Sequence, residues 1–291
     1  MTYVTGDVHG YFGRIGRFCA YAGTTRDDVV VVLGDACVNF WGDEADDALK
    51  RRIESLPVTV LCVHGNHEAR PATVPGYEEA PWRGGTVYRQ RRYPHVLFAK
   101  DGSVFDLDGL SCLVAGGAYS IDKDFRLRDG RRWFPDEQPG PVERANVERA
   151  CERRGWQVDC VFSHTCPLER RPFDAFLARV RQREVDTSTE EWLSAIAARL
   201  TYRRWLHGHF HVDRRDDPRM WTLFRDVIEL RSGRVRYTAA MDARVCAGLA
   251  PGEPDAPAPL PVAAGAAEPR PAVTTPVTLG PVTPRRRADA R

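Results

Sequence analysis

A continuous apolar run, Val29–Leu33, and a second, mostly apolar run, Val58–Val63, constrain the fold of this 291-residue chain more than any other feature. Each run has the length of one β-strand and no alternation with polar residues, which is typical of strands covered on both faces. Between them, Asp43 to Ser55 is acidic at its start and basic at its end, as the helix dipole favours. Buried strands joined by helices predict an α/β fold.

The rest of the first 246 residues continues this alternation and then changes character. A strand at Tyr3–Thr5 and a helix from Phe12 to Ala22, stopped by Gly23, come first. Short strands then follow one another, and we expect hairpin turns at Asp101-Gly102 and Asp108-Gly109. The further elements that we expect are strands at Val96–Phe98, Val104–Leu107, Ser111–Val114, Val158–Phe162, Trp205-Leu206, Trp221–Phe224, Val227–Leu230 and Val235–Tyr237, and helices at Val142–Arg154 and Thr189–Leu200. This order predicts two packed mixed β-sheets flanked by helices.

Composition divides the chain into one large folded domain, residues 1–246, and a Pro/Ala-rich tail, residues 247–291. The stretch from Pro251 to Arg291 holds 10 of the 21 prolines and no aromatic residue. It cannot bury enough apolar surface to offset its ordering entropy, so we expect it to be disordered.

Charge, apolar content and cysteine usage exclude several classes of protein. No run approaches the ~18 apolar residues of a membrane helix, and the N-terminus lacks the pattern of a secretion signal. The net charge of +2 does not favour nucleic acid as a partner. The eight cysteines form no C-x-x-C pair, which indicates a reducing, cytoplasmic location.

The chemically informative residues form five short motifs, each directly after an expected strand. They are Gly6-Asp7-Val8-His9-Gly10, Gly34-Asp35, Gly65-Asn66-His67-Glu68, Ser163-His164-Thr165 and Gly208-His209-Phe210-His211. Their carboxylate, amide and imidazole groups suit Mn, Fe, Zn or Ni. Residues two apart in extended chain point the same way, so Asp7 with His9, and His209 with His211, can each converge on one point. The two oxygens of Asp35 can bridge two ions.

In order and spacing, these motifs resemble the complete signature of the calcineurin-like metallophosphoesterases, and the match spans residues 3 to about 240. The resemblance implies a four-layer αββα sandwich. It also implies that Asp7, His9, Asp35 and His211 hold one divalent metal ion, and that Asp35, Asn66, His164 and His209 hold a second. His67 is then the general acid that protonates the leaving oxygen.

The function that this resemblance implies is phosphoester hydrolysis by metal-activated hydroxide, with Mn²⁺ as the favoured ion and Fe, Zn or Ni as alternatives. We expect a phosphomonoesterase that acts on a phosphoprotein or a small phosphoester. A phosphodiesterase or nuclease on the same metal core is the alternative. A third interpretation, a non-catalytic metal-bearing scaffold, is disfavoured because every expected position carries a suitable residue.

One departure separates the chain from the phosphoprotein phosphatase branch, whose motif wording is the most similar. That branch continues its second motif as Gly-Asp-x-Val-Asp-Arg-Gly, whereas the chain reads Ala36-Cys37-Val38-Asn39-Phe40 after Asp35. The phosphate-binding Arg is therefore missing, and Arg70, Arg126 and Arg128 are candidates to replace it. We also expect the insertion that carries Tyr119, Trp133 and Phe134 to cover the metal cleft or to pack on the sheet.

Overall fold

A computed structural model describes residues 1–176, 180 and 182–254, all of which belong to one compact unit. The last helix, α6 (Ala239–Cys246), ends at the predicted domain boundary. The prediction of a disordered tail falls mostly on residues 255–291, which lie outside the described residues.

The larger sheet has eight strands in the order β13-β12-β1-β2-β3-β6-β5-β4. The four central strands β1, β2, β3 and β6 run parallel, and the remaining pairs are antiparallel. Their bounds are β1 Thr2–Thr5, β2 Val29–Val32, β3 Thr59–Cys62, β4 Glu78–Trp82, β5 Gly85–Gln90, β6 Tyr93–Ala99, β12 Val227–Glu229 and β13 Val235–Tyr237. Their parallel direction places the ends of β1, β2 and β3 at one edge of the sheet.

The smaller sheet has five strands in the order β11-β10-β9-β8-β7. Strands β8 to β11 are parallel, and β7 pairs with β8 through a hairpin turn at Asp108-Gly109, as predicted. The bounds are β7 Val104–Leu107, β8 Leu110–Ala115, β9 Cys160–Ser163, β10 Arg204–His207 and β11 Met220–Thr222.

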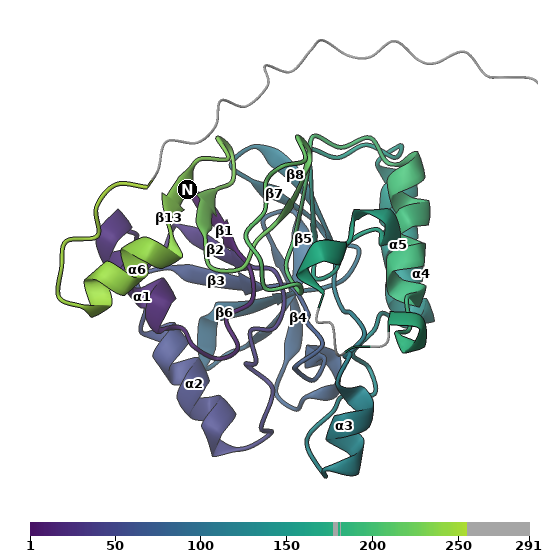
Figure 1. Cartoon of the computed structure of the whole chain (residues 1–291), viewed down its shortest axis with the longest axis horizontal. Coiled ribbons are helices and arrows are strands. Elements are labelled where there is room, and N and C mark those ends of the chain that lie inside the picture. Colours follow the sequence, from purple (N-terminus) through teal and green to yellow (C-terminus); the bar gives the residue numbers. More distant parts are fainter. Residues whose placement is uncertain (177–179, 181, 255–291) are drawn as a thin grey trace, which may run out of the picture. The chain divides into compact units, whose positions relative to one another are not determined.

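The two sheets pack face to face with helices on both outer sides, which confirms the predicted fold class (Figure 1). On the outer face of the larger sheet lie α1 (Gly13–Ala22), α2 (Glu44–Glu54) and α6. On the outer face of the smaller sheet lie α4 (Pro141–Arg153) and α5 (Ser188–Arg199). Strand β2 shows why its sequence is uniformly apolar: Val29 and Val31 face the other sheet, while Val30 and Val32 face the helices.

Three features of the fold differ from the sequence prediction. Asp101-Gly102 is not a hairpin turn, because the chain there crosses from β6 in one sheet to β7 in the other. The sequence does not predict the edge strand β4 and its neighbour β5, because most of their side chains are at least partly exposed, which weakens the apolar pattern. The insertion before α4 contains a short helix, α3 (Lys123–Arg128), which buries no residue and so has no periodic signal.

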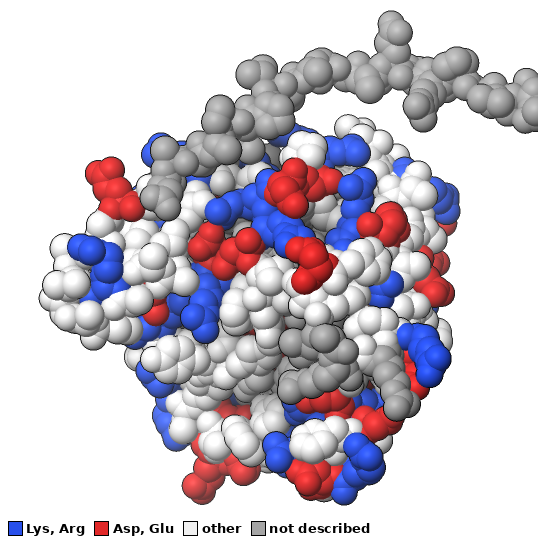
Figure 2. Space-filling model, viewed as in Figure 1, with Lys and Arg blue, Asp and Glu red and all other residues white. Residues whose placement is uncertain are grey.

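Figure 2 shows acidic and basic side chains interspersed over one face of the molecule. A surface of this kind presents no extended field of one sign. Among the described helices, none combines the length and the apolar character that crossing a bilayer requires. All eight cysteines are free thiols, and seven of them are at least partly buried.

Candidate metal centre

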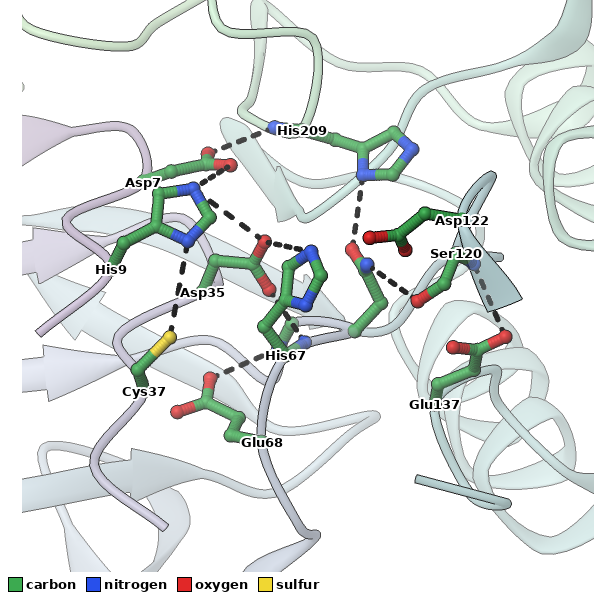
Figure 3. Close-up of polar contacts among 12 residues, drawn as sticks. Asp7, His9, Asp35, Cys37, His67, Glu68, Ser120, Asp122, Glu137 and His209 are labelled. Carbon is green, nitrogen blue, oxygen red and sulfur yellow. Dashed lines mark hydrogen bonds and ion pairs between the residues drawn. The ribbon is translucent and has the colours of Figure 1, made fainter. Parts of the chain in front are cut away.

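The five motifs meet at one edge of the double sheet because each follows the end of a parallel strand. Asp7, Asp35 and Asn66 follow β1, β2 and β3 of the larger sheet. His164 follows β9, and the segment with His209 follows β10 of the smaller sheet. Figure 3 shows Asp7, Asp35, His67 and His209 directed toward a common centre. The packing of the two sheets therefore brings together groups that lie far apart in the chain.

A first set of donor atoms comprises Asp7, His9, Asp35 and His211, which all lie within 4.8 Å of one another. Nε2 of His211 lies 3.1 Å from Oδ2 of Asp7 and 2.9 Å from Nε2 of His9. Nε2 of His9 is 3.8 Å from Oδ2 of Asp7 and 4.0 Å from Oδ2 of Asp35. Two carboxylates and two imidazoles thus surround one point, and this donor chemistry suits a first-row dication.

A second set of donors converges on the amide oxygen of Asn66. Nε2 of His164 lies 2.7 Å from Oδ1 of Asn66, and Nδ1 of His209 lies 3.1 Å from the same oxygen. Oδ1 of Asp35 is 3.4 Å from Nε2 of His164, while Oδ2 of Asp35 faces His9. Asp35 therefore contacts both sets.

The ring of His164 is held in an orientation that suits a metal ligand. Its Nδ1 lies 2.8 Å from the carbonyl oxygen of Leu33. A carbonyl only accepts, so Nδ1 is the donor, and Nε2 is the ring nitrogen that can offer a lone pair to a metal ion. Nε2 in turn faces the oxygen of Asn66, which also offers a lone pair. Two lone pairs aimed at one another suit a shared cation, so the second set fits a metal ion.

Backbone conformation brings these groups unusually close. A Cβ on Gly34 would lie 2.0 Å from Nδ1 of His164, and φ at this glycine is +94°. Positive φ values also occur at four of the donor residues, namely His9, Asp35, His209 and His211. Such conformations are strained in residues other than glycine and concentrate at functional sites. The surrounding sheets hold them in place.

The carboxylates of the site are stabilised as anions. Burial alone would raise the pKa of Asp35, but the neighbouring His164, His67 and His9 bring it well below its usual range. The pKa of Asp7 is likewise lowered: the nearby His211 and His164 outweigh its burial. Both side chains are therefore ionised at neutral pH, which is the form that binds a metal.

Two imidazoles of the site respond to their surroundings in opposite ways. Burial lowers the pKa of His209 to about 3, so this ring is neutral and offers a lone pair at neutral pH. The Asp7 carboxylate raises the pKa of His211 and so favours the protonated ring. A proton on the coordinating nitrogen must leave before that nitrogen can bind a cation. Metal binding at the first set should accordingly release a proton.

His67, the expected acid, lies beside Asp35 but outside both donor sets. Its Nε2 is 3.8 Å from Oδ2 of Asp35, and its backbone N–H donates to Oδ1 of Asp35 at 2.9 Å. Burial lowers the pKa of its ring, although Asp35 opposes this shift. Unlike the buried donor His164, its side chain is 18% exposed, so the ring is open to a substrate.

The three arginines that the sequence suggested as phosphate ligands occupy different positions in the structure. Arg70 is turned to another part of the fold: its Nη1 lies 2.6 Å from Asp101, and its Nε donates to the carbonyl of Asp136. It lines a separate small cavity beside His64 and neither cavity at the metal centre, so its role as a phosphate ligand stays a prediction. Arg128 is exposed and lines neither cavity at the metal centre. Arg126 lines the centre, and its Nε is 2.8 Å from Oδ2 of Asp122.

Two residues outside the five motifs, Ser120 and Glu137, support the second donor set. The hydroxyl of Ser120 accepts a hydrogen bond from Nδ2 of Asn66 at 2.9 Å, so the amide oxygen faces His164 and His209. Glu137 accepts from the backbone N–H of Ser120 at 3.1 Å (Figure 3). Ser120 follows β8, a strand parallel to β9, which explains how it reaches this edge.

Glu68, the last residue of the third motif, ties two strand-end loops together. One of its carboxylate oxygens accepts from the backbone N–H of Val38 at 3.2 Å, and the other accepts from Gly65. Burial and the nearby Asp35 raise the pKa of Glu68 to about 8. Its position explains why an acidic residue follows His67 without being directed at the metals.

Two cavities meet at the centre and share His67, Asp122 and His211. One has a volume of about 450 Å³ and extends past Asn66 and His209. The other has a volume of about 700 Å³ and extends past His9, Tyr11 and Trp41. The donor sets thus lie at the floor of a cleft that is open in two directions.

This fold and this paired donor set define an α/β protein with a candidate dinuclear metal centre. The chain belongs to the calcineurin-like phosphoesterase family, which matches residues 2–213. Family and donor set together indicate metal-dependent phosphoester hydrolysis.

Two solved structures align with most of the chain. One is TT1561 of Thermus thermophilus, with 13% identity, a TM-score of 0.46, and coverage of 80% of this chain and 96% of that chain. The other is the phosphopantetheinyl hydrolase PptH from Mycobacterium tuberculosis, with 18% identity, a TM-score of 0.38, and coverage of 77% of this chain and 89% of that chain. No curated protein matches the chain.

Proposed function

We propose that the chain is a phosphoester hydrolase with two divalent cations, Mn²⁺ first among the candidates, one in each donor set. The observation that carries this proposal is the position of Asp35, whose two oxygens face different sets. When bound, such ions supply positive charge for phosphate oxygens and lower the pKa of a water molecule to near neutrality. Asp7, His9 and His211 would hold one ion, and Asn66, His164 and His209 the other.

His67 supplies the proton for the leaving oxygen in this proposal. Its ring lines both cavities, so it is within reach of an ester group on either side of the phosphorus. The negative charge of an entering phosphate favours the protonated ring and opposes the effect of burial. Asp35, through the backbone N–H of His67, fixes the position from which this proton is delivered.

Two observations favour a phosphodiester over the phosphomonoester that the sequence analysis favoured. The cleft is open on two sides of the metal centre, so each of two ester groups has a place. The carboxylate of Asp122 lines both cavities and is bonded to Arg126, which reduces the positive charge available to a substrate. A phosphomonoester carries up to two negative charges at neutral pH and a diester only one, so Asp122 penalises the monoester more.

The activity is tested with the full-length chain and added Mn²⁺. We expect faster hydrolysis of bis(4-nitrophenyl) phosphate than of 4-nitrophenyl phosphate. If only the monoester is cleaved, the diesterase proposal is wrong and the monoesterase remains. If neither is cleaved by protein that carries two metal ions, the non-catalytic scaffold replaces both.

The role of His67 is tested separately with His67→Asn. Because general acid catalysis contributes roughly 10²- to 10⁴-fold, we expect kcat to fall by this factor while metal content stays unchanged. The control is His95→Asn, since His95 is hydrogen-bonded to Glu54 and lines neither cavity of the centre. Equal kcat in both variants would remove His67 from the mechanism.

A further inference from the structure

The smaller of the two cavities at the metal centre has a wall of apolar side chains. We call it the aromatic cavity; its apolar wall includes Tyr119, Ile121, Phe176, Phe210 and Val212. Tyr119 and Ile121 come from the segment after β8, and Phe210 and Val212 from the segment after β10. The sequence of the donor motifs therefore also provides part of this wall.

The aromatic rings of the wall contact one another and a histidine of the metal centre. Phe210 stacks on Phe176, with an angle of 18° between the rings and 5.9 Å between their centres. Phe210 also meets the ring of His209 edge-on, with the centres 5.0 Å apart. An apolar group bound against Phe176 and Phe210 is thus held close to a donor of the second set.

Three polar side chains outside the donor region, Arg171, Gln182 and Glu190, also line this cavity. Its charged residues away from the centre, Arg171 and Glu190, have opposite signs. The guanidinium of Arg171 lies over the rings of Phe173 and Phe176, 5.1 and 5.6 Å from their centres. Thr165 donates to Oε1 of Glu190 at 2.8 Å, while Oε2 of Glu190 is buried and has no hydrogen-bond partner among the described residues. Apart from these three residues and the residues of the metal centre, the wall is mainly apolar, and the cavity has the size that takes a small organic group.

The other cavity differs in character. Its volume is larger, and two of its three aromatic side chains, Tyr11 and Trp41, are 62% and 53% exposed, while Phe40 is partly buried. A group there stays largely in water, so little apolar surface is removed from solvent. Of the two directions in which an ester group can extend from the centre, the aromatic cavity buries it better.

We propose that the aromatic cavity binds one ester group of the substrate, that this group is aryl or similarly apolar, and that Tyr119, Ile121, Phe176 and Phe210 determine this specificity. The proposal rests on the proposed function, since it places the phosphorus at the metal centre. It adds the chemical class of the esterified group and the residues that select it.

The test compares phenylphosphonate with methylphosphonate as ligands of the Mn²⁺-loaded full-length chain, by calorimetry. Both carry the same phosphonate head group, so the ratio of their dissociation constants reports the ring alone. A hydrophobic pocket discriminates by roughly tenfold or more for groups that differ in this way, so we expect phenylphosphonate to bind about 10-fold more tightly. Ile121→Ala and Phe176→Ala should bring the ratio toward one without weakening methylphosphonate.

Two further variants serve as controls. Phe125→Ala removes a ring that is exposed and lines neither cavity, so the ratio should stay at its wild-type value. Trp41→Ala removes the exposed ring of the other cavity, and it too should leave the ratio unchanged. Ile121 is 47% exposed, so its truncation should leave folding intact even if Phe176→Ala does not.

The outcomes separate this inference from the proposed function. If phenylphosphonate and methylphosphonate bind equally, or if Trp41→Ala alone abolishes the preference, the inference is wrong while phosphoester hydrolysis stands. If neither phosphonate binds and no phosphoester is cleaved by metal-loaded protein, the proposed function fails, and the inference fails with it.

Discussion

Ser120→Ala tests whether the surroundings of Asn66 prepare it to bind a metal ion. The Ser120 hydroxyl is the acceptor for Nδ2 of Asn66, and both side chains are buried. Without it, the amide loses the contact that keeps its oxygen toward His164 and His209, and a buried N–H is left without an acceptor. Loss of a partner that orients a metal ligand lowers metal affinity by about 10- to 100-fold. This factor corresponds to about 1.4 to 2.7 kcal/mol.

The assay is a calorimetric titration of the metal-free protein with Mn²⁺. In the wild type we expect two binding steps; in Ser120→Ala only the step at the Asn66 set should weaken, because the Ser120 hydroxyl supports Asn66 and not the first donor set. The unfolding free energy of the metal-free protein should also fall, by about 1–3 kcal/mol, for the unsatisfied N–H.

The matched control is Ser103→Ala. Ser103 is also buried, and its hydroxyl donates to the carbonyl oxygen of Thr86, away from the metal centre. This variant should lose a similar amount of stability while keeping both Mn²⁺ affinities. If Ser120→Ala and Ser103→Ala bind Mn²⁺ equally well, the orienting role of Ser120 is refuted.

Three further predictions concern stability. Gly34→Ala should lower the unfolding free energy by about 2–4 kcal/mol in a denaturant titration, because its Cβ would meet His164 in a strained backbone. In the control Gly23→Ala, φ is also positive, at +64°, but nothing lies within 4 Å, so the loss should be only about 1–2 kcal/mol. Equal losses in the two variants would argue against the close approach of Gly34 to His164. The hydrogen bonds from Arg17 lower the pKa of Asp242, so the ion pair stabilises the fold fully above the unfolded pKa of about 3.9, and the stabilisation disappears as pH falls through the lower folded pKa. Asp242→Asn should therefore lower the unfolding free energy by about 1 kcal/mol at pH 7 and by almost nothing in strong acid, below the folded pKa. A loss that is independent of pH would contradict this prediction. Adding Mn²⁺ at about 100 times its dissociation constant should raise the unfolding free energy by about 2.7 kcal/mol per site, and chelation should reverse it; an unchanged thermal midpoint would mean that no site is filled.

The strand-end residues could be predicted from sequence because their signal is local. Each of Asp7, Asp35, Asn66, His164 and His209 closely follows an apolar strand, and parallel strands end at one sheet edge. Their convergence therefore needs only the correct order of strands in two packed sheets. The structure brings all of them together, although their roles as ligands stay a prediction.

The supporting residues could not be predicted because nothing local marks them. Ser120 lies in a segment without apolar periodicity, and its importance depends on where β8 lies beside β9. Arg70 looked suitable because it follows the third motif, but the pairing of its side chain with Asp101 depends on the crossover between sheets. Contacts of this kind are set by tertiary structure, which one sequence does not encode in a short pattern.

The most direct test of the account is anomalous diffraction from crystals of the full-length chain grown with Mn²⁺. We expect two Mn²⁺ peaks about 3.5–4 Å apart, one on each side of the Asp35 carboxylate. The nearer groups should be Asp7, His9 and His211 for one peak and Asn66, His164 and His209 for the other. A single peak, or two peaks that do not share Asp35, would contradict the dinuclear centre on which the proposed hydrolysis depends.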